Sequence, residues 1–472
     1  MVDEFETGET TNMKTRDEQS YSTTGEDRTM TVVDRQKVAR KAAGALMAAI
    51  ALLTAACAQD SGRREGADES TTTQTYRVLR VGKGRQYKTI QAAVDAAKEG
   101  DLVLIDRGVY HESVIVQTEN IVIRGVDRNE VILDGKFELD NGITVFANGV
   151  AVENLTARNY KVNGVFFTGD YDEGFTLTGY RISYVTALNN GDYGIYAFNA
   201  TRGQIDHSYA SGSPDAGFYI GQCNPCNALV WKVTAEANQI GYSGTNSSDV
   251  VIAESVWRRN RLGIVPNSQD GEKLPPVQRN TIVGNLVIDN DNPKTPEKNS
   301  DYRVGTGTGI VLTGAVETVV ERNTVVENDR AGIVVIPWLF SGTQWQAKDN
   351  VVRDNFVRGA RTAADLVLGL TDSSRGPLGN CFAANDFETS IPDDIEKVAP
   401  CEGQAATGFD TLEKHLSAFT PGPEPIDYKD VPAPPLEFEN MPDAETAPPR
   451  PAVDVPIRLD LKAIKAPRPP RD

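Results

Sequence analysis

The sequence Gly194-Ile-Tyr-Ala-Phe198 recurs, with changes, as Gly217-Phe-Tyr-Ile-Gly221 and as Gly241-Tyr-Ser-Gly-Thr245. Further glycine–apolar pairs extend the pattern in both directions, at Gly142, Gly164, Gly263, Gly309 and Gly332. Successive marker glycines are 22, 30, 23, 24, 22, 46 and 23 residues apart. A period near 22 to 23 residues is too short for a helical hairpin or a propeller blade, and it suits one turn of a stacked β-solenoid. The repeat therefore predicts an all-β chain wound as a solenoid.

A second marker sits five positions after a similar polar residue in several repeats. The pairs are Asn154/Asn159, Ser255/Asn260, Asn285/Asn290, Asn323/Asn328 and Asn350/Asn355. Because asparagine tolerates left-handed backbone and hydrogen-bonds locally, we expect these residues at the sharp corners of the coil. Stacked over successive coils, their amides can form a ladder inside the solenoid. We interpret these asparagines as structural.

The start of the repeat region carries a family resemblance. Its segments are Tyr87-Lys-Thr-Ile-Gln-Ala-Ala-Val-Asp-Ala-Ala97 and Gly108-Val-Tyr-His-Glu112. They resemble the opening of right-handed parallel β-helix proteins of the pectin-lyase-like superfamily, and of pectin methylesterases in particular. The resemblance implies a right-handed, single-stranded parallel β-helix. The first segment would be an N-terminal helix, capped by Thr89, that covers the open first coil.

Catalytic residues do not carry over from this resemblance. The Asp, Gln and Arg blocks of pectin methylesterases are not found, nor are the long signatures of pectate lyases. Asp206-His207 is only a faint echo of the Asp-Pro-His-Asp motif of alginate epimerases. Because neighbouring residues in a strand face opposite sides, we expect no dyad between Asp206 and His207. The catalytic residues, and the question whether the chain is an enzyme, therefore stay open.

The N-terminal region resembles an exported bacterial lipoprotein. An apolar stretch, AAGALMAAIALLTAA at 42–56, follows four basic residues and is short for a membrane span. The box Thr54-Ala-Ala-Cys57 resembles a lipoprotein cleavage site, although Thr54 departs from the usual Leu, Val or Ile. We therefore predict lipidation at Cys57 and anchoring to the outer face of the bacterial cytoplasmic membrane.

The rest of the chain divides by composition. We expect a non-native or disordered extension at 1–29, a signal peptide at 30–56, a flexible tether at 57–75, the β-helix at 76–375, a C-terminal cap region at 376–420 and an extended tail at 421–472. The tail holds 14 of the 25 prolines, and it either lies along the solenoid or spans cell-envelope polymer. In the cap region, Asp410-Thr-Leu-Glu413 fits a capping box that opens a helix.

The net charge and the cysteine content limit which partners and metal ions are expected. The net charge is −18 and no basic patch is present, so nucleic acid is not an expected partner. Four cysteines form two pairs suited to an oxidising compartment, and we predict the disulfides Cys223–Cys226 and Cys381–Cys401. Zinc and copper are disfavoured because the chain has only three histidines and five methionines. We expect a monomer without metal or cofactor, with Ca²⁺ only if the protein is a lyase.

Aligning the coils on the marker glycine sorts the side chains by face. The next residue points inward, giving the column Val165, Ile195, Phe218, Tyr242 and Ile264. The residue after it points outward, and three neighbouring coils then stack Phe166, Tyr196 and Tyr219 on the surface. The amides Asn199, Gln222 and Asn246 follow these strands, and an insert beside the first strand carries Asp170, Asp172 and Glu173.

An aromatic strip flanked by amides and carboxylates suits a glycan, because rings stack on sugar C–H faces and polar groups fix hydroxyls. The alternative is a solvated stacking ladder that only stabilises the sheet. The acidic insert is either a plain surface loop, a carboxylate pair for glycoside hydrolysis or a Ca²⁺ site for a lyase. Arg258, Arg259 and Arg261 are expected to form a solvated basic turn, with a lyase-type base as the alternative.

Two longer inserts, near 267–276 and 291–308, decorate the coil between Gly263 and Gly309. Inserts of this kind lie on the lateral surface and often carry function. Three functions follow from the sequence: non-catalytic binding of a cell-surface or environmental polysaccharide, cleavage of a polysaccharide by a lyase or hydrolase, and a structural or adhesive role at the surface.

Overall fold

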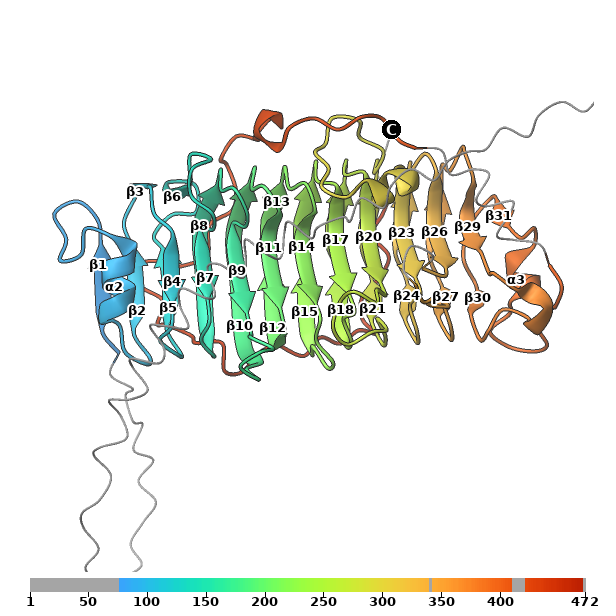
Figure 1. The fold of residues 1–472 in the computed structure, drawn as a ribbon, viewed down its shortest axis with the longest axis horizontal. Helices are drawn as coiled ribbons and strands as arrows, with labels where there is room; N and C mark the ends of the chain where they lie inside the picture. The colour runs from blue at the N-terminus through green and yellow to red at the C-terminus, as the bar shows by residue number, and fades with distance from the viewer. Residues whose placement is uncertain (1–75, 339–341, 410–420, 470–472) are drawn as a thin grey trace, which may run out of the picture. The chain divides into compact units, whose positions relative to one another are not determined.

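The computed structural model describes residues 76–338, 342–409 and 421–469. Cys57, the predicted signal peptide and the predicted capping box at Asp410–Glu413 lie outside the described residues. Residues Gln74–Asp472 form one compact unit. Within it, two parallel sheets of 20 and 11 strands run along the coils (Figure 1). Among the described residues, no helix has the length and apolar character needed to cross a membrane.

The strands of each sheet come from successive coils. The 11-stranded sheet contains β4 (Val114–Val116), β7 (Ile143–Val145), β9 (Val165–Thr168), β11 (Tyr193–Phe198), β14 (Ala216–Gly221), β17 (Ile240–Thr245), β20 (Leu262–Asn267), β23 (Thr308–Thr313), β26 (Ala331–Ile336), β29 (Ala364–Leu368) and β31 (Ser390–Ile391). The 20-stranded sheet contains β1 (Val78–Val81), β2 (Leu102–Ile105), β3 (Gly108–Tyr110), β5 (Val122–Gly125), β6 (Val131–Asp134), β8 (Val150–Arg158), β10 (Leu177–Leu188), β12 (Ala200–Asp206), β13 (Tyr209–Ser211), β15 (Ala228–Trp231), β16 (Thr234–Glu236), β18 (Val250–Ala253), β19 (Val256–Arg258), β21 (Thr281–Val283), β22 (Leu286–Ile288), β24 (Val319–Glu321), β25 (Thr324–Val326), β27 (Val351–Arg353), β28 (Phe356–Arg358) and β30 (Cys381–Ala383).

Short helices lie at the ends of the coils and in the loops. They are α2 (Ile90–Ala96), α3 (Ile395–Val398) and the 3₁₀ turns η1 (Ser300–Gly305), η2 (Ser373–Arg375) and η3 (Tyr428–Asp430). Helix α2 confirms the predicted N-terminal helix, since the Thr89 side chain accepts a hydrogen bond from the backbone N–H of Ala92. Ile90 and Val94 of this helix are buried against the first coils. Figure 1 shows α2 at the blue end of the β-helix and α3 at the orange end.

The interior of the β-helix confirms the predicted inward column and the predicted amide ladder. Side chains of that column, such as Ile195, Phe218 and Ile264, have no exposed surface. Two ladders of side-chain amides run through buried corners. Nδ2-to-Oδ1 hydrogen bonds of 2.9, 2.9 and 3.0 Å link Asn238, Asn260, Asn290 and Asn328, and bonds of 2.9, 3.0 and 2.9 Å link Asn285, Asn323, Asn355 and Asn385.

The left-handed corners fall mostly on the residue before a ladder asparagine. Arg259, Asp289 and Glu327 have φ values of 51°, 54° and 53°, each one position before its asparagine. The expected left-handed asparagine occurs in an early coil, at Asn154 and Asn159. In the later coils the ladder residues are therefore selected by their side-chain amides, which bond to the next coil, rather than by tolerance of positive φ.

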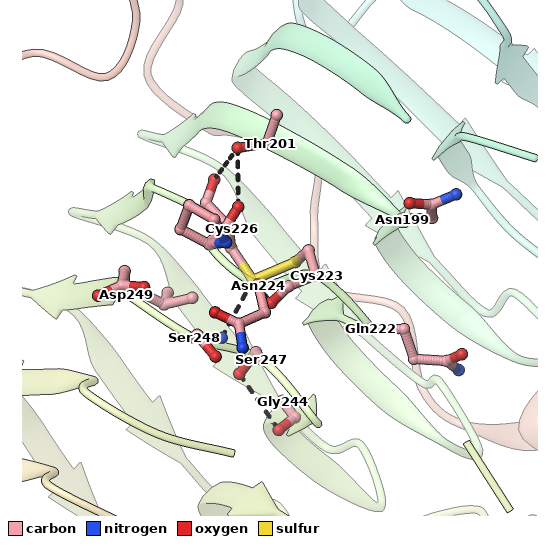
Figure 2. The surroundings of a disulfide bond; sticks show 12 residues. Asn199, Thr201, Gln222, Cys223, Asn224, Cys226, Gly244, Ser247, Ser248 and Asp249 are labelled. Carbon is pink, nitrogen blue, oxygen red and sulfur yellow. Dashed lines mark hydrogen bonds between the residues drawn. A yellow bond between two sulfur atoms is a disulfide. The ribbon is translucent and has the colours of Figure 1, made fainter. Parts of the chain in front are cut away.

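Both predicted disulfides, Cys223–Cys226 and Cys381–Cys401, are present. The first lies at the corner that follows β14, where Ser248 donates its backbone N–H to Cys226 Sγ at 3.2 Å. Figure 2 shows this disulfide beside Thr201 and Ser248, with the side chain of Gln222 directed away from the sulfur atoms. The bridge thus closes a local loop next to the strand that carries Tyr219.

The proline-rich segment 421–469 lies against the β-helix (red in Figure 1). Arginines of the coils donate to its backbone carbonyls. Arg124 bonds to Ala447 O at 2.6 Å, and Arg181 bonds to Arg450 O at 2.8 Å. Because proline leaves a carbonyl as the only backbone hydrogen-bonding group, donors on the coil match the chemistry of this segment.

Candidate functional site

The predicted aromatic column forms on the outer face of the 11-stranded sheet. Tyr196 of β11 pairs in register with Phe166 of β9 and with Tyr219 of β14. The rings of Phe166 and Tyr196 stack at 4.6 Å between centroids, and Tyr196 meets Tyr219 edge-on at 4.8 Å. The inward and outward assignments are therefore confirmed.

The expected exposure of this column is wrong for two of its three rings. Phe166 is 4% exposed and Tyr219 is 3% exposed, whereas Tyr196 is partly exposed. Tyr219 lies along its own strand, with its ring over Gly221 and its hydroxyl group near Thr245. The sheet face is covered here because tyrosines of neighbouring coils pack on one another instead of projecting outward.

The three predicted amides hold loops and are not free for a sugar. Asn199, Gln222 and Asn246 sit at left-handed corners and are 2%, 5% and 0% exposed. Gln222 accepts a 3.1 Å hydrogen bond from the backbone N–H of Lys273, and Asn246 donates to Gln269 O at 2.8 Å. Gln222 and Asn246 therefore fasten the insert at 267–276 to the coils, whereas Asn199 donates to Phe175 O, at the end of the acidic insert, at 3.1 Å.

The first aspartate of the acidic insert, Asp170, caps the turn that the insert forms. Asp170 Oδ1 accepts hydrogen bonds from the backbone N–H groups of Asp172 at 3.0 Å and Glu173 at 3.2 Å. Asp172 and Glu173 are exposed. Among the described residues, no cluster of three His, Cys, Asp or Glu side chains has a geometry suited to a metal ion. The carboxyl group of Asp170 thus has a local structural role.

Polar side chains of this face form a second column, which was not among the site residues predicted from the sequence. It lies two residues before each marker glycine and consists of Asp140, Val162, Asp192, Asp215, Gln239, Arg261, Gly307 and Arg330. The coils stack it in register, since the backbone N–H of Asp215 donates to Asp192 O at 3.1 Å. The signal was available in the sequence, because the four successive column positions after Val162 are all polar or charged.

The insert at 291–308 brings a lysine to two of these carboxylates. Lys298 Nζ lies 2.6 Å from Asp192 Oδ1 and 3.9 Å from Asp215 Oδ2. Gln239, of the same column, fixes the insert by donating from Nε2 to Asn299 O at 2.6 Å. The two carboxyl groups therefore share one ammonium group across adjacent coils.

Arg261 also belongs to this column, and its position differs from the one predicted from the sequence. It was expected in a solvated basic turn, but it is fully buried, and its Nε donates to Thr295 Oγ1 at 2.7 Å. Arg258 and Arg259 are exposed and pair with Glu236, as a solvated turn requires. Arg261 differs because the insert folds over it.

Tyrosine rings complete the arrangement. Tyr193 donates its hydroxyl hydrogen to Asp215 Oδ2 at 2.9 Å, and its ring stacks on Tyr196 at 4.3 Å. Lys298 Nζ lies 5.6 Å from the centroid of the Tyr193 ring. We name Asp192, Tyr193, Tyr196, Asp215 and Lys298 the tyrosine–carboxylate site.

The pKa values in this site are shifted by burial and by neighbouring charges. Burial raises the pKa of Asp192 to about 6, with Asp215 adding to the rise and Lys298 opposing it. Burial also raises the pKa of Asp215, against Lys298 and the Tyr193 hydrogen bond. Burial lowers the pKa of Lys298, but attraction to the two carboxylates outweighs it and leaves a net rise. Burial raises the pKa of Tyr193 well above 10, so its hydroxyl remains a hydrogen-bond donor.

Solvent still reaches the charged groups of the site. The side chains of Asp192, Asp215 and Lys298 are 17%, 18% and 41% exposed. A carboxyl group with a pKa near 6 that keeps contact with solvent can hold and deliver a proton near neutral pH. The tyrosine–carboxylate site therefore combines aromatic faces, hydrogen-bond acceptors and a proton donor on one partly exposed surface.

The pair Asp206 and His207 also differs from expectation. His207 Nδ1 lies 2.8 Å from Asp206 Oδ1, although adjacent strand residues were expected to face opposite sides. His207 has a φ of 46°, which ends the alternation of β12 and turns its ring back toward Asp206. The ring stacks on Tyr184 at 4.7 Å, on the 20-stranded sheet and in a different part of the coils from the tyrosine–carboxylate site.

Comparison with known proteins supports the architecture. A family model described as "right handed beta helix region" matches residues 141–295. No curated protein matches the sequence. Similar solved structures include the A-module of the Azotobacter vinelandii mannuronan C-5 epimerase AlgE4, at 17% identity over 63% of this chain and 90% of that chain, with a TM-score of 0.46.

Two further solved structures match at similar levels of identity. A mannuronic acid-specific polysaccharide family 6 lyase from human gut microbiota has 14% identity over 71% of this chain and 78% of that chain, with a TM-score of 0.43. Pectate lyase Pel9A has 12% identity over 78% of this chain and 90% of that chain, with a TM-score of 0.41. The matching family model and the two parallel sheets built from successive coils make the chain a right-handed parallel β-helix, as predicted.

Proposed function

We propose that this chain binds a polysaccharide at the tyrosine–carboxylate site on the lateral face of its β-helix. The stacked pair Tyr193 and Tyr196 is the observation that carries the proposal, because both rings are partly exposed and lie beside two carboxylates. Aromatic faces stack on sugar C–H groups, and carboxylate oxygens accept hydrogen bonds from sugar hydroxyls. Parallel coils spaced about 4.8 Å apart repeat this chemistry along the axis, as a linear polymer requires.

The location of the protein is part of the proposal. With the predicted lipid anchor at Cys57, the β-helix stands outside the bacterial cytoplasmic membrane, where cell-envelope and environmental glycans are available as partners. The two disulfides are compatible with such an oxidising compartment. Mass spectrometry of Cys57 in protein extracted from membranes tests the anchor, and an unmodified thiol there would contradict it.

A glycan array probed with the full-length protein tests the binding function. Tyr196→Ala should weaken binding of every glycan that scores, by about 1 to 3 kcal/mol, because it removes a partly exposed platform ring. Tyr184→Ala is the matched control, since this tyrosine is also partly exposed but belongs to the 20-stranded sheet. Equal binding by the wild type and Tyr196→Ala, with binding lost in Tyr184→Ala, would move the site to the other sheet.

Hydrolysis of the bound glycan is the second candidate function, and the paired carboxyl groups favour it. Asp192 and Asp215 both contact one ammonium group, so they flank a common point. In this reaction protonated Asp192 gives its proton to the leaving oxygen as the glycosidic C–O bond breaks, and Asp215 accepts a proton from the water whose oxygen forms the new bond to the anomeric carbon. Lyase chemistry is less suited, because the raised pKa values keep Tyr193 and Lys298 protonated near neutral pH, so neither is available to take a proton.

A product assay on any glycan that binds separates the two functions. Hydrolysis predicts new reducing ends, which Asp192→Asn should reduce by at least about a hundredfold, the usual contribution of a general acid. Asp140→Asn, in the same column two coils away, is the control that should keep activity. Binding without product leaves the protein as a binding protein, and unsaturated ends would instead indicate a lyase.

A further inference from the structure

The C-terminal tail passes along one edge of the tyrosine–carboxylate site. Ile426 of the tail donates its backbone N–H to Thr295 O at 3.1 Å, in the insert at 291–308 that carries the lysine of the site. Tyr428 O accepts a hydrogen bond from Asn189 Nδ2 at 2.7 Å, three residues before the first carboxylate of the site. The same short stretch of the tail therefore contacts the segments that supply the ammonium group and a carboxyl group.

The backbone that carries the Tyr428 side chain is anchored on both sides. Asn189 is 4% exposed, and its Nδ2 also donates to Val431 O at 2.8 Å. Tyr428 begins the turn η3, which Asp427 caps by accepting a hydrogen bond from the backbone N–H of Lys429 at 3.0 Å. Val431 is buried. The position of Tyr428 is thus set by contacts with the coils.

The ring of Tyr428 lies against Gly191, the residue before Asp192. A Cβ atom at Gly191 would meet Lys161 O and would lie 3.0 Å from Tyr428 Cζ, so glycine lets both the neighbouring coil and the ring come this close. Phe137 meets the Tyr428 ring edge-on, at 5.7 Å between centroids. Because Tyr428 is partly exposed, it presents ring surface to solvent beside the site.

The other aromatic residue of the tail has a different environment. Phe438 packs at 4.6 Å between centroids on Tyr209, which is 6% exposed, and the guanidinium of Arg128 lies 5.0 Å from its ring. Phe438 therefore covers the 20-stranded sheet. Tyr428 lies on glycine backbone instead, and the ammonium group near its ring, 5.7 Å from the centroid, belongs to the exposed side chain of Lys429.

We propose that Tyr428 is a further sugar-stacking residue of the glycan site, so that the C-terminal tail supplies part of the binding surface. This inference rests on the proposed function, because it adds a subsite to that same site. Tyr193 and Tyr196 bind one part of the glycan, and Tyr428 binds the part that extends along the coils toward Phe137. Its ring offers a face for sugar C–H groups, and Lys429 offers a donor for a hydroxyl oxygen.

Oligosaccharides of increasing length test the inference. We would measure calorimetric affinities of the full-length protein for β-1,4-linked oligosaccharides, from disaccharide to octasaccharide, in glucose, N-acetylglucosamine, mannose and galactose series. In the series that binds, the affinity of the wild type should rise with length until the Tyr428 subsite is filled. Tyr428→Ala should weaken binding of the longest member on the order of tenfold and leave the shortest member that binds unchanged.

Two further variants separate stacking from packing. Tyr428→Phe keeps the ring face and should bind every length as the wild type does. Phe438→Ala removes the other ring of the tail and is the matched control, which should leave the affinity for every length unchanged. Thermal melts of all variants confirm that each is folded.

The outcomes separate the inference from the function beneath it. A folded Tyr428→Ala variant that binds the longest member as tightly as the wild type would overturn the inference and leave glycan binding in place. Equal losses at every length, or an equal loss in Phe438→Ala, would also overturn it, because the ring would then act through packing of the tail. The absence of binding by the wild type, in all series and on the glycan array, would overturn the proposed function and the inference together.

Discussion

Two polar columns run along this β-helix, and their stacked side chains obtain hydrogen-bond partners in opposite ways. The buried column Asn260, Asn290 and Asn328 satisfies itself, because each amide donates to the next coil and accepts from the previous one. The column at Asp192 and Asp215 cannot do so, because an ionised carboxylate only accepts hydrogen bonds. Lys298 and the Tyr193 hydroxyl supply the missing donors from outside the column.

On a regular solenoid, reactive groups arise where a polar column cannot satisfy its own hydrogen bonds. An amide column in which each side chain bonds to the next needs no other partner, and in this protein it is buried. A column of like charges needs partners from other segments, keeps some contact with solvent and has shifted pKa values. Groups of the second kind are the ones that titrate near neutral pH and meet a ligand.

The largest effect is expected from placing a carboxylate in the amide column. Asn290→Asp replaces a donor that bonds to Trp257 O at 2.9 Å and Asn328 Oδ1 at 3.0 Å with an acceptor, so both oxygens lose their donor. We expect a loss of about 4 kcal/mol in the free energy of unfolding, measured by urea denaturation at neutral pH. Asn227→Asp, at an exposed corner, should change it by less than about 0.5 kcal/mol. Equal stability of the two variants would show that the ladder contributes little.

Tyr219→Ala tests whether the rings beside the carboxylate column are packed or free. The side chain is 3% exposed, so its removal should cost about 3 kcal/mol of unfolding free energy. An expectation from sequence alone, with Tyr219 facing solvent, gives almost no change. Differential scanning calorimetry decides between the two, and an unchanged melting temperature would contradict the packed arrangement.

The pH dependence of stability tests the charge column. The pKa of Asp192 is raised in the folded protein to about 6 from an ordinary value near 3.8. Its contribution to stability is therefore fully present below about pH 4 and is lost as the pH rises through about 6. A rise of roughly two units corresponds to about 2 to 3 kcal/mol.

Asp192→Asn should remove that part of the pH dependence, because the amide does not titrate. Unfolding free energies of the wild type and the variant, compared from about pH 4 to 7, measure the difference. Parallel curves for the two proteins would show that Asp192 titrates normally. Asp140→Asn, whose carboxyl group is exposed, serves as the control.

The smallest effect is expected at the acidic insert. Asp170→Ala removes the acceptor for the backbone N–H groups of Asp172 and Glu173, which should cost about 1 kcal/mol. Glycan affinity should stay unchanged, because this carboxyl group is engaged in its own turn. A tenfold loss of glycan affinity in the variant would show instead that the insert takes part in binding.

The sequence predicts the repeated parts of this protein well and the unrepeated parts poorly. The marker glycines and the alternation of side chains suffice to assign Ile195 inward and Tyr196 outward, because both follow from the period of the coil. The same alternation fails at His207, where a left-handed corner turns the chain. It also gives no measure of burial, so Tyr219 was expected to be exposed.

The candidate site depends on contacts that periodicity does not contain. Lys298 is 106 residues from Asp192 in the sequence and reaches it from an insert, which no repeat constrains. The column of Asp192 and Asp215 could have been found by reading two positions before each marker glycine. Its role still required the structure, because only the contacts of Lys298 and Tyr193 distinguish it from an ordinary solvated edge.

A crystal structure of the protein with the oligosaccharide that binds most tightly tests the central claim most directly. The account predicts a sugar ring stacked on Tyr193 or Tyr196, at about 4 to 5 Å between ring centroids, with hydroxyl groups directed at Asp192 and Asp215. A sugar bound instead beside Tyr184 and His207 on the 20-stranded sheet, with the tyrosine–carboxylate site empty, would contradict it.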